Sequence, residues 1–561
     1  ISHTALNSLL KLLKFHIPEL PIDARSLLGT CREIKVKVIE PGQYYHFGVE
    51  NCIKYLVRYS NDFPKSTEIE LAINIDGLPL AKSSGSQVYP ILCRLIKVNS
   101  NVDMIGIYHG YAKPKEANCY LKDFVEDITK VINTGTIIDN KHYSVKISYF
   151  ICDAVAKAYI TYTVGHMGYY SCTKCHEEGT YINNRVCFPN TNHLKLRTDI
   201  DYRLKAQEDH HIGTSLLEQI PNLDMIKSFP LDPMHLIYLG VVKKLIVNLW
   251  CFGKPPVKLS SRNITDISSN LINQAKNIPV EFNRKPRSLL EAKRWKATEF
   301  RQFLLYTGPV VLKKILNNDR YINFLSLHIA TTILASSKYL HFIDYASDLL
   351  LYFVNTFKIL YGAENISHNV HNLLHLSEDV RVYGPLDNFS AFPFENYLQS
   401  ILKTIRKNEK PLAQIVKRKS EQNSQPHEQI EIRNKRYPIC KNEHSNGPTI
   451  NLNIYKQFRK IILQDFVLHI DYPNNCCTFH NGDIILIENI VDYTDKFKLI
   501  GRKFLTTENF YTYPCESKEI GIFLVNNLGP LQIFNVEDIS SKCVILNWEE
   551  RHVIFPQIHE H

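Results

Sequence analysis

The sequence lacks a hydrophobic run that we expect to cross a membrane. The most apolar stretch of its later part, residues 321–337, is interrupted by His328 and by several Ser and Thr. It falls short of the roughly 20 apolar residues that a spanning helix needs. A secretory signal is lacking too, because residues 6–14 place leucines at helical spacing with lysines between them, a pattern typical of an amphipathic helix. We therefore expect no membrane partner.

The sequence also lacks the features of a disulfide framework. It has 14 Cys but no secretory signal, so most of them are expected to be buried thiols. Cys172 and Cys175 have the spacing of a zinc knuckle. The chain begins with Ile rather than Met. We expect it to be part of a longer intracellular protein.

Length and charge indicate several domains and an anionic partner. With 561 residues, 44% of them hydrophobic and 22% charged, the chain suits two to four globular domains. Its net charge of +10 is concentrated in residues 284–296, with six Lys or Arg against one Glu, and in residues 403–419, with seven against one. Such clusters favour nucleic acid as a partner, the alternative being solvated helix faces.

Two expected strands end in an acidic residue. Apolar side chains alternate along residues 68–76, which end at Asp76-Gly77, and residues 145–152 form a strand followed by Asp153. Alone, Asp-Gly is also a common hairpin turn. Between these two segments we expect strands 88–98 and 103–109 and helix 116–132, and after them helix 156–164.

This order is that of an RNase H-like core, in which the first and fourth strands are neighbours. Asp76 and Asp153 would then converge at one edge of the sheet. Carboxylates in such a pair suit two Mg²⁺ or Mn²⁺ ions, which prefer hard oxygen ligands and stabilise both oxygens of a phosphoryl displacement. A third acid is required further along the chain.

The rest of the chain suggests two further parts. Residues 260–363 are predicted to be helical almost throughout, as an all-α insertion. Residues 421–447 are polar and suit a linker. Residues 466–555 have short strand patterns separated by turn residues and predict a small β-barrel.

Five motifs together resemble the transposases of the CACTA (EnSpm) superfamily of cut-and-paste DNA transposons, over about residues 1–420. They are INIDGLPL with Asp76, YFICDAVAKAY with Asp153, SCTKCHEEG with Cys172 and Cys175, FPLDPMHLIYLG with Asp232 and His235, and HNVHNLLHLSEDVRVYGPLDNFSAFPFENYLQSI with Glu395. Each motif is weak alone; five in the right order are strong.

The resemblance implies an α/β protein whose RNase H-like mixed sheet is interrupted by a large all-α insertion. The small C-terminal β-barrel-like domain is predicted from its own strand pattern. The implied catalytic triad is Asp76, Asp153 and Glu395. We expect an N-terminal mostly helical region (1–65), the first part of the core (66–170), a zinc knuckle and helical insertion (171–383), the last core helix with the third acid (384–420), a linker (421–455) and a β-rich C-terminal domain (456–561).

The resemblance also implies a zinc site. It would use Cys172 and Cys175 with His371 and His375, a set that can be tetrahedral. The site would tie the insertion to the core. The alternatives are a local site drawing on residues of the knuckle region, and no metal at all. The local candidates are His176, Cys187 and His193.

Asp232 and His235 match a D-x-x-H motif of related superfamilies and are expected to support the active site. Helix capping by Asp232 ahead of Pro233 is the simpler alternative. The expected DNA contacts come from the two basic segments. Trp295 could stack on an unpaired base, although a lone Trp is more often core. The basic residues expected at DNA are Arg294, Lys296, Lys403, Arg406 and Lys407.

We therefore predict a nuclear DNA transposase that cleaves and joins phosphodiester bonds of double-stranded DNA, acting as a homo-oligomer on transposon ends and target. The rival from another class is a domesticated transposase, retained as a DNA-binding or regulatory protein without catalysis. An unrelated RNase H-like nuclease is disfavoured by the long insertion between Asp153 and Glu395.

Overall fold

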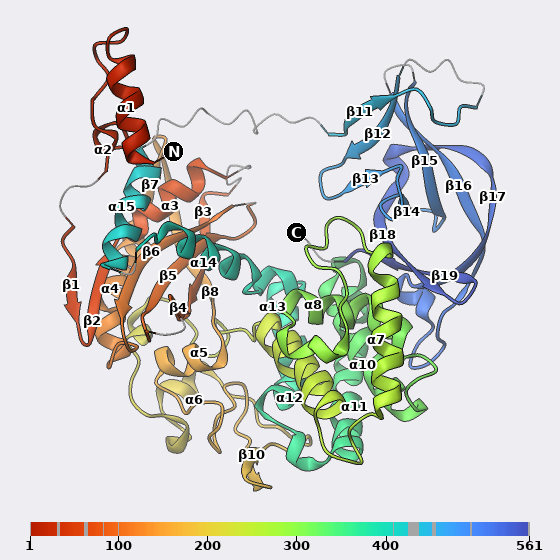
Figure 1. Ribbon diagram of the computed structural model, residues 1–561. Coiled ribbons are helices and arrows are strands. Elements are labelled where there is room, and N and C mark those ends of the chain that lie inside the picture. The colour runs from red at the N-terminus through yellow and green to blue at the C-terminus, as the bar shows by residue number, and fades with distance from the viewer. Residues whose placement is uncertain are drawn as a thin grey trace. The chain divides into compact units, whose positions relative to one another are not determined.

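The computed structural model divides the chain into two compact units (Figure 1). Unit 1 consists of Ile1–His176, Lys195–Asp232 and Phe389–Asn434, and unit 2 of Glu177–Leu194, Pro233–Asn388 and Lys435–His561. The structure describes residues 2–30, 34–60, 66–81, 84–98, 100–407, 409–424, 437–450, 456–493 and 496–558. Residues 425–436 and 451–455 of the expected linker lie outside the described residues. The bounds of the six segments expected from the sequence stay predictions.

Unit 1 is built on a curled mixed sheet of eight strands (Figure 1). Among the described strand pairs of this sheet, β3 with β8 is parallel and the others are antiparallel. The sheet order is β1 (Lys37–Ile39), β2 (Gly42–His46), β6 (Val102–Gly110), β5 (Gln87–Leu95), β3 (Glu68–Ile75), β8 (Lys141–Ile151) and β7 (Thr136–Ile138), with β4 (Leu78–Pro79) paired to β5. The region before residue 66, expected to be mostly helical with a strand-like segment at residues 34–39, contributes strands β1 and β2.

Strand β3 lies inside the sheet. Its first residues alternate between partly exposed and buried, as the sequence predicts, but from Leu71 to Ile75 every side chain is buried. Burial on both faces is the property of a central strand covered on both sides. The polar Asn74 is buried with them and is 3% exposed.

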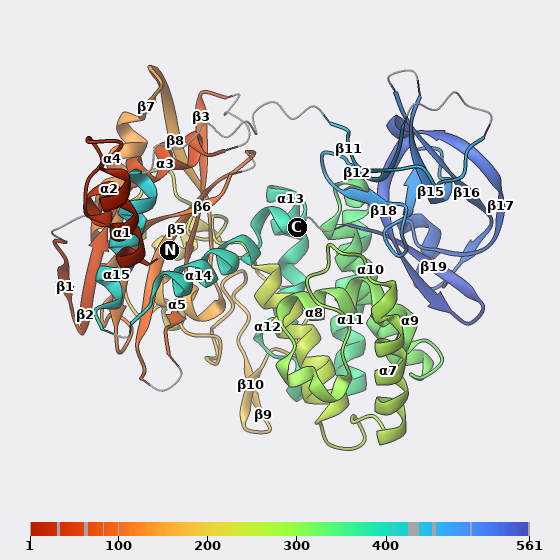
Figure 2. The ribbon, with the colours of Figure 1, turned by 45° about the horizontal axis from the view of Figure 1, so that its top comes forward.

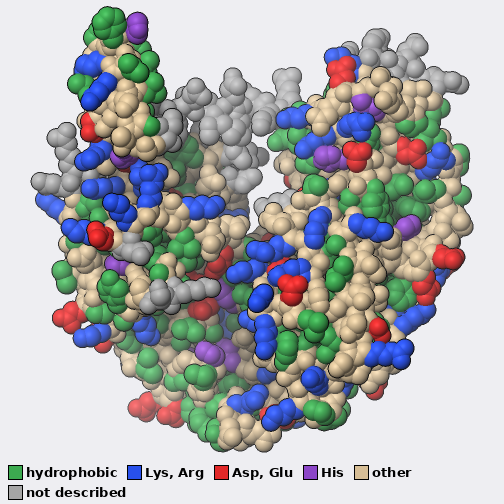
Figure 3. Space-filling model, viewed as in Figure 1, with side chains coloured by type: hydrophobic (Ala, Val, Ile, Leu, Met, Phe, Trp, Pro, Cys, Tyr) green, Lys and Arg blue, Asp and Glu red, His purple; other side chains and the backbone are tan. Residues whose placement is uncertain are grey.

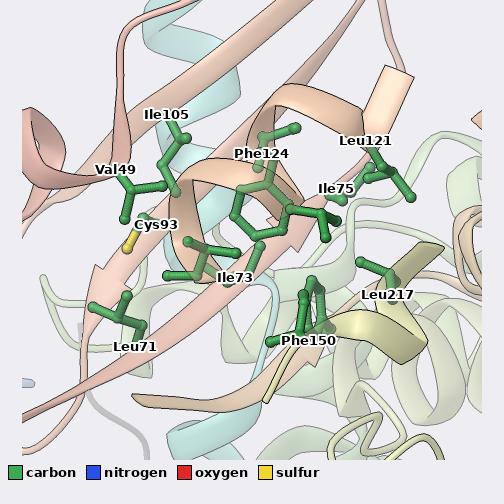
Figure 4. Packing of buried hydrophobic residues seen from close by; sticks show 14 of the residues in the cluster. Val49, Leu71, Ile73, Ile75, Cys93, Ile105, Leu121, Phe124, Phe150 and Leu217 are labelled. Carbon is green, nitrogen blue, oxygen red and sulfur yellow. The ribbon is translucent and has the colours of Figure 1, made fainter. Parts of the chain in front are cut away.

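Helices α3 (Val49–Arg58) and α4 (Ala117–Thr134) contribute their apolar stripes to the core of unit 1. In Figure 4, Phe124 of α4 lies close to Ile73 of β3 and Phe150 of β8. The rings of Phe124 and Phe150 meet edge to face at 6.3 Å. The remaining helices of this unit are α1 (His3–Leu13), α2 (Ala24–Leu27), α5 (Ala154–Thr161), α6 (Asp199–Arg203), α14 (Phe392–Thr404) and α15 (Pro411–Ser424).

The middle of the chain forms the helical part of unit 2, in which α10 and α11 lie side by side (Figures 1 and 2). Two successive helices in this part, η3 (Met234–Val242) and η4 (Lys244–Cys251), are wound as π-helices. The other elements are β9 (Thr180–Ile182), β10 (Arg185–Cys187), α7 (Ser261–Gln274), α8 (Ala297–Gln302), α9 (Gly308–Leu312), α10 (Asn318–Ala335), α11 (Ile343–Tyr361), α12 (His368–Asn372) and α13 (Leu376–Tyr383).

Within the described residues, one segment is long and apolar enough to cross a membrane by length and composition. It is Met234–Cys251, and 67% of it is buried. The core helix of a soluble protein or a signal sequence passes the same test, so this is weak evidence.

The C-terminal part of unit 2 is an antiparallel sheet (Figure 2). Strand β15 pairs with both β14 and β16, so that six strands, β15-β14-β18-β19-β17-β16, pair in a closed circuit. The strands are β11 (Ile439–His444), β12 (Lys456–Ile462), β13 (Val467–His469), β14 (Cys476–Phe479), β15 (Ile484–Tyr493), β16 (Lys496–Asn509), β17 (Phe523–Asn535), β18 (Ile539–Trp548) and β19 (Arg551–Pro556).

A buried ion pair joins this sheet to the helical part of unit 2. Lys542 of β18, with a fully buried side chain, lies 2.5 Å from Glu281. Its ammonium also donates to the carbonyl of Val467 at 2.8 Å.

We predict that Lys542→Met lowers the free energy of unfolding by about 3–5 kcal/mol, because it leaves the Glu281 carboxylate buried without its counter-charge. The double variant Lys542→Met/Glu281→Leu, which removes both charges, should recover much of this loss. Thermal unfolding of the three proteins measures the effect. A double variant no more stable than Lys542→Met would contradict the reason given.

Candidate active site and metal-binding cluster

Asp76 and Asp153 follow neighbouring parallel strands, as the sequence predicts. Asn74 of β3 is in register with Ile151 of β8, two positions before each acid. The buried side chain of Asn74 also donates a hydrogen bond to the Ile151 carbonyl at 2.8 Å. The two strand ends are therefore held together directly before the acids.

The charges of both acids raise the pKa values of Tyr89 and Cys152. Burial raises the pKa of the Tyr89 hydroxyl, and the nearby charges of Asp76 and Asp153 raise it further. Burial likewise raises the pKa of the Cys152 thiol, with the same two acids adding to the effect. Gly77 is required beside Tyr89, because a Cβ at this position would lie 2.7 Å from the ring. The two carboxylates thus share one environment lined by neutral side chains.

Glu395 reaches the same place from helix α14. It lies in the first turn of this helix, and its carboxylate oxygen lies within 4.8 Å of an oxygen of Asp76. Asp76 and Glu395 are both partly exposed. Their oxygens are therefore close enough to share a bound cation.

Asp153 has a second role. One of its oxygens accepts a hydrogen bond at 2.6 Å from the backbone N–H of Ala156, which caps the N-terminus of α5. A cap satisfies one of the four N–H groups that a helix leaves without an internal partner. The Asp153 carboxylate is thus oriented by the helix that it starts.

Asp232 positions the helix that carries Glu395. It is 3% exposed, and its Oδ1 accepts a hydrogen bond at 2.9 Å from the backbone N–H of Ala391, the residue before α14. Asp232 therefore holds the backbone at the start of α14 in place.

Lys157 is a positioning residue that the sequence analysis missed. Its ammonium is buried one turn after Asp153 and donates to the carbonyls of Phe229 and Pro230 at 3.1 and 3.3 Å. The segment that leads to Asp232 is thereby fixed to α5. The signal was present in the sequence, because a single Lys in the otherwise apolar turn AVAKAY has to find polar partners when that turn is buried.

Other residues singled out in the sequence lie in unit 2. His235 is partly exposed in the first turn of the π-helix η3. Arg294 and Lys296 are exposed. Trp295 between them is 5% exposed and packs against Phe300 and Phe303, with ring centroids 5.4 and 5.8 Å apart. The indole therefore belongs to the core, as is more common for a lone Trp, and a contact of Trp295 with DNA stays a prediction.

The basic residues after Glu395 are exposed, and of the three only Lys403 lies on its helix. Lys403 is in the last turn of α14, which ends at Thr404. The chain then turns, and the backbone N–H groups of Arg406 and Lys407 donate to the side-chain oxygen of Gln414 at 2.9 and 3.2 Å. The expectation of one continuous helix through these positions is wrong, because this loop is closed by Gln414. Figure 3 shows further Lys and Arg side chains over α15 of unit 1.

The residues of the expected zinc site form two close pairs. The sulfur atoms of Cys172 and Cys175 are 3.5 Å apart, and the Nε2 atoms of His371 and His375 are 3.4 Å apart. All four side chains are buried, and one ligand atom from each lies within 4.8 Å of the others. The structure therefore contains a buried Cys2His2 cluster that could bind a metal such as zinc. Two thiolates and two imidazoles are a typical donor set for tetrahedral zinc.

A positive charge lies beside the two thiols. The buried guanidinium of Arg197 donates to the Cys172 carbonyl at 3.0 Å and places a positive charge beside the pair. The candidates for a local site have other partners. His176 lies 3.6 Å from Asp201, and the Cys187 thiol donates to the carbonyl of Glu364 at 3.0 Å.

We predict that the purified protein holds about one zinc per chain and that Cys172→Ser/Cys175→Ser loses it. The reason is that serine hydroxyls replace the two thiolates that zinc prefers. Metal analysis after dialysis measures the content. Cys187→Ser is the matched control and should keep the metal; zinc lost from the control but kept by the double variant would move the site to the local alternative.

Comparison with known proteins identifies one part of the chain. Residues 443–557, which hold most of the C-terminal antiparallel sheet, match the family described as Domain of unknown function (DUF8592). No curated protein matches the sequence.

Proposed function

We propose that the chain is a DNA transposase in which unit 1 is an RNase H-like catalytic core and the helices of unit 2 are its all-α insertion. The observation that carries the proposal is the meeting of Asp76 and Glu395 within 4.8 Å, directly after the parallel pair β3–β8 that also ends in Asp153. A turn or a cap would account for one of these acids. Neither accounts for a carboxylate brought to Asp76 from a helix more than 300 residues later.

The oxygen donors fit Mg²⁺ or Mn²⁺. Carboxylates from Asp76, Asp153 and Glu395 are hard ligands of the kind that these ions prefer. Ions held there would polarise the phosphate and activate the attacking oxygen. The protein's own part is to hold the three carboxylates at the strand ends and helix start, and to keep the neighbouring Tyr89 and Cys152 neutral.

The same three carboxylates would support two reactions, DNA cleavage and strand transfer. In cleavage, water attacks the phosphorus atom and the DNA 3′-hydroxyl leaves; in strand transfer, that 3′-hydroxyl attacks a target phosphodiester and displaces another 3′ oxygen. Phosphoryl transfer of this kind depends on positioning and charge stabilisation and needs no covalent protein intermediate. The substrate would be double-stranded transposon-end and target DNA in the nucleus, held by a homo-oligomer.

Zinc in the Cys2His2 cluster would have a structural role. Four protein ligands close its coordination shell and leave no position for water or substrate. The cluster therefore offers stability rather than chemistry, and the catalytic proposal does not depend on it.

We predict that Glu395→Gln and Asp153→Asn each abolish Mg²⁺-dependent cleavage of transposon-end DNA while DNA binding stays within a factor of about two. Both changes keep the shape and remove only a metal-binding charge. A gel assay of labelled end DNA measures cleavage, and a binding titration without divalent metal measures affinity.

Asp153 offers a matched control on stability. Asparagine caps a helix about as well as aspartate, whereas alanine costs about 1 kcal/mol. Asp153→Asn should therefore unfold like the parent and Asp153→Ala earlier, although neither cleaves. Full cleavage by either Asp153 variant would show that this acid serves only as a cap.

The helix cap formed by Asp153 favours the alternative function, a domesticated transposase without catalysis. Because Asp153 contributes to the stability of α5, its presence does not by itself require catalysis. A parent protein that binds end DNA but cleaves none under Mg²⁺ or Mn²⁺ would favour the domesticated function.

We predict that Arg406→Ala/Lys407→Ala weakens DNA binding and lowers the slope of log affinity against log salt by about two units, since each phosphate contact releases about one counterion. Salt-dependent binding titrations measure the slope. Lys122→Ala/Lys130→Ala removes the same charge from exposed positions on α4 and is the control. Equal slopes for the two double variants would mean that the loop after α14 makes no specific phosphate contact.

A further inference from the structure

Unit 1 contains a cleft on the side of α14 that faces away from Glu395. The cleft has a volume of about 460 Å³. Its residues on α14 recur at helical spacing, from Pro393 through Tyr397 and Ser400 to Thr404. Glu395 lies two positions after Pro393, which turns its side chain by about 200° from this face. The cleft is therefore distinct from the acidic site.

A buried ion pair forms the inner wall of the cleft. Asp103 of β6 and Lys419 of α15 are 2% and 5% exposed and form a close ion pair. The hydroxyl of Tyr397 also donates to Asp103, at 3.4 Å. Lys419 lies over the ring of Tyr55 at 4.1 Å. These contacts neutralise both charges inside the wall and fix the two tyrosines in place.

The rest of the lining is neutral. Burial raises the pKa of Tyr55 to about 12, with the Asp103 charge adding to the effect, so the phenol carries no charge near neutral pH. Met104, Ile401 and Ile415 supply apolar surface, and the amides of Asn101, Asn396 and Gln422 lie along the same cleft. An apolar and aromatic wall edged by amides fits a flat, neutral heterocycle that carries hydrogen-bond donors and acceptors on its rim.

We propose that this cleft binds one unpaired or extrahelical nucleobase of the DNA. The amides suit the hydrogen-bonding edge of a base, and the apolar and tyrosine surfaces suit its faces. Lys403 at the end of the same helix and Arg406 and Lys407 in the loop after it are exposed and suit the phosphates of the same strand. The inference depends on the DNA partner of the proposed function but not on catalysis.

The test uses binding of the whole chain to end DNA that carries a single-stranded flank, without divalent metal. One abasic position at a time is moved along the flank. We expect one position at which loss of the base weakens binding about tenfold, since contacts of one base with protein contribute about 1–3 kcal/mol. Equal affinities for every abasic position would overturn the proposal.

A variant that fills the cleft, together with a matched control elsewhere in unit 1, tests where the base binds. Ser400 is an exposed helix hydroxyl that donates to the carbonyl of Tyr397, and Thr134 on α4 is an exposed hydroxyl that donates in the same way to Lys130. Ser400→Trp should bind the intact and the abasic DNA equally, and Thr134→Trp should keep the tenfold difference. A Ser400→Trp protein that retains the difference places the base elsewhere and refutes the site.

Photo-crosslinking of the parent protein locates the base directly. It therefore tests the proposal even if the Ser400→Trp variant fails to fold. DNA with 5-iodouracil at the sensitive position should crosslink the parent protein at Tyr55 or Tyr397, as peptide mass spectrometry can identify. Crosslinks confined to other segments overturn the inference. Because none of these measurements needs cleavage, they fail independently of the cleavage assays on the Glu395 and Asp153 variants, which test the catalytic proposal.

Discussion

The parallel pairing of β3 with β8 is the constraint on which the candidate site depends. Every other described pair in the curled sheet of unit 1 is antiparallel, so this pair alone in the described sheet brings two strand ends out on the same edge. The amide of Asn74, bonded to the Ile151 carbonyl, holds the ends together at the last paired position. Asp76 and Asp153 follow this position by two residues each, and the charges of both act on Tyr89 and Cys152.

The third acid depends on a different kind of support. Helix α14 arrives from a distant part of the sequence and has no strand pairing to fix it. Its start is held by the buried carboxylate of Asp232, and the chain before Asp232 is held by Lys157. Because Lys157 is on the helix that Asp153 caps, the supports of the second and third acids form one connected set of hydrogen bonds.

The sequence predicted what depends on local pattern. Alternating apolar residues located β3, and the acids after two strands located the site, because both are properties of a few consecutive residues. It could not reveal that α14 ends at Thr404, which reflects the loop closed by Gln414, or that Trp295 is core, which depends on Phe300 and Phe303. The cleft beside Asp103 could not be predicted from the sequence either, because its lining comes from four separate segments.

The helix cap formed by Asp153 limits the substitutions that would accumulate at this position in an inactive copy of the sequence. If the proposed catalytic function holds, a copy that no longer needs chemistry loses the selection that metal binding imposes on Asp76 and Glu395. Position 153 would remain under selection for stability and accept Asn, Ser or Thr as readily as Asp. In a lineage of inactive copies, the first and third acids should therefore drift freely while the second varies only among capping residues.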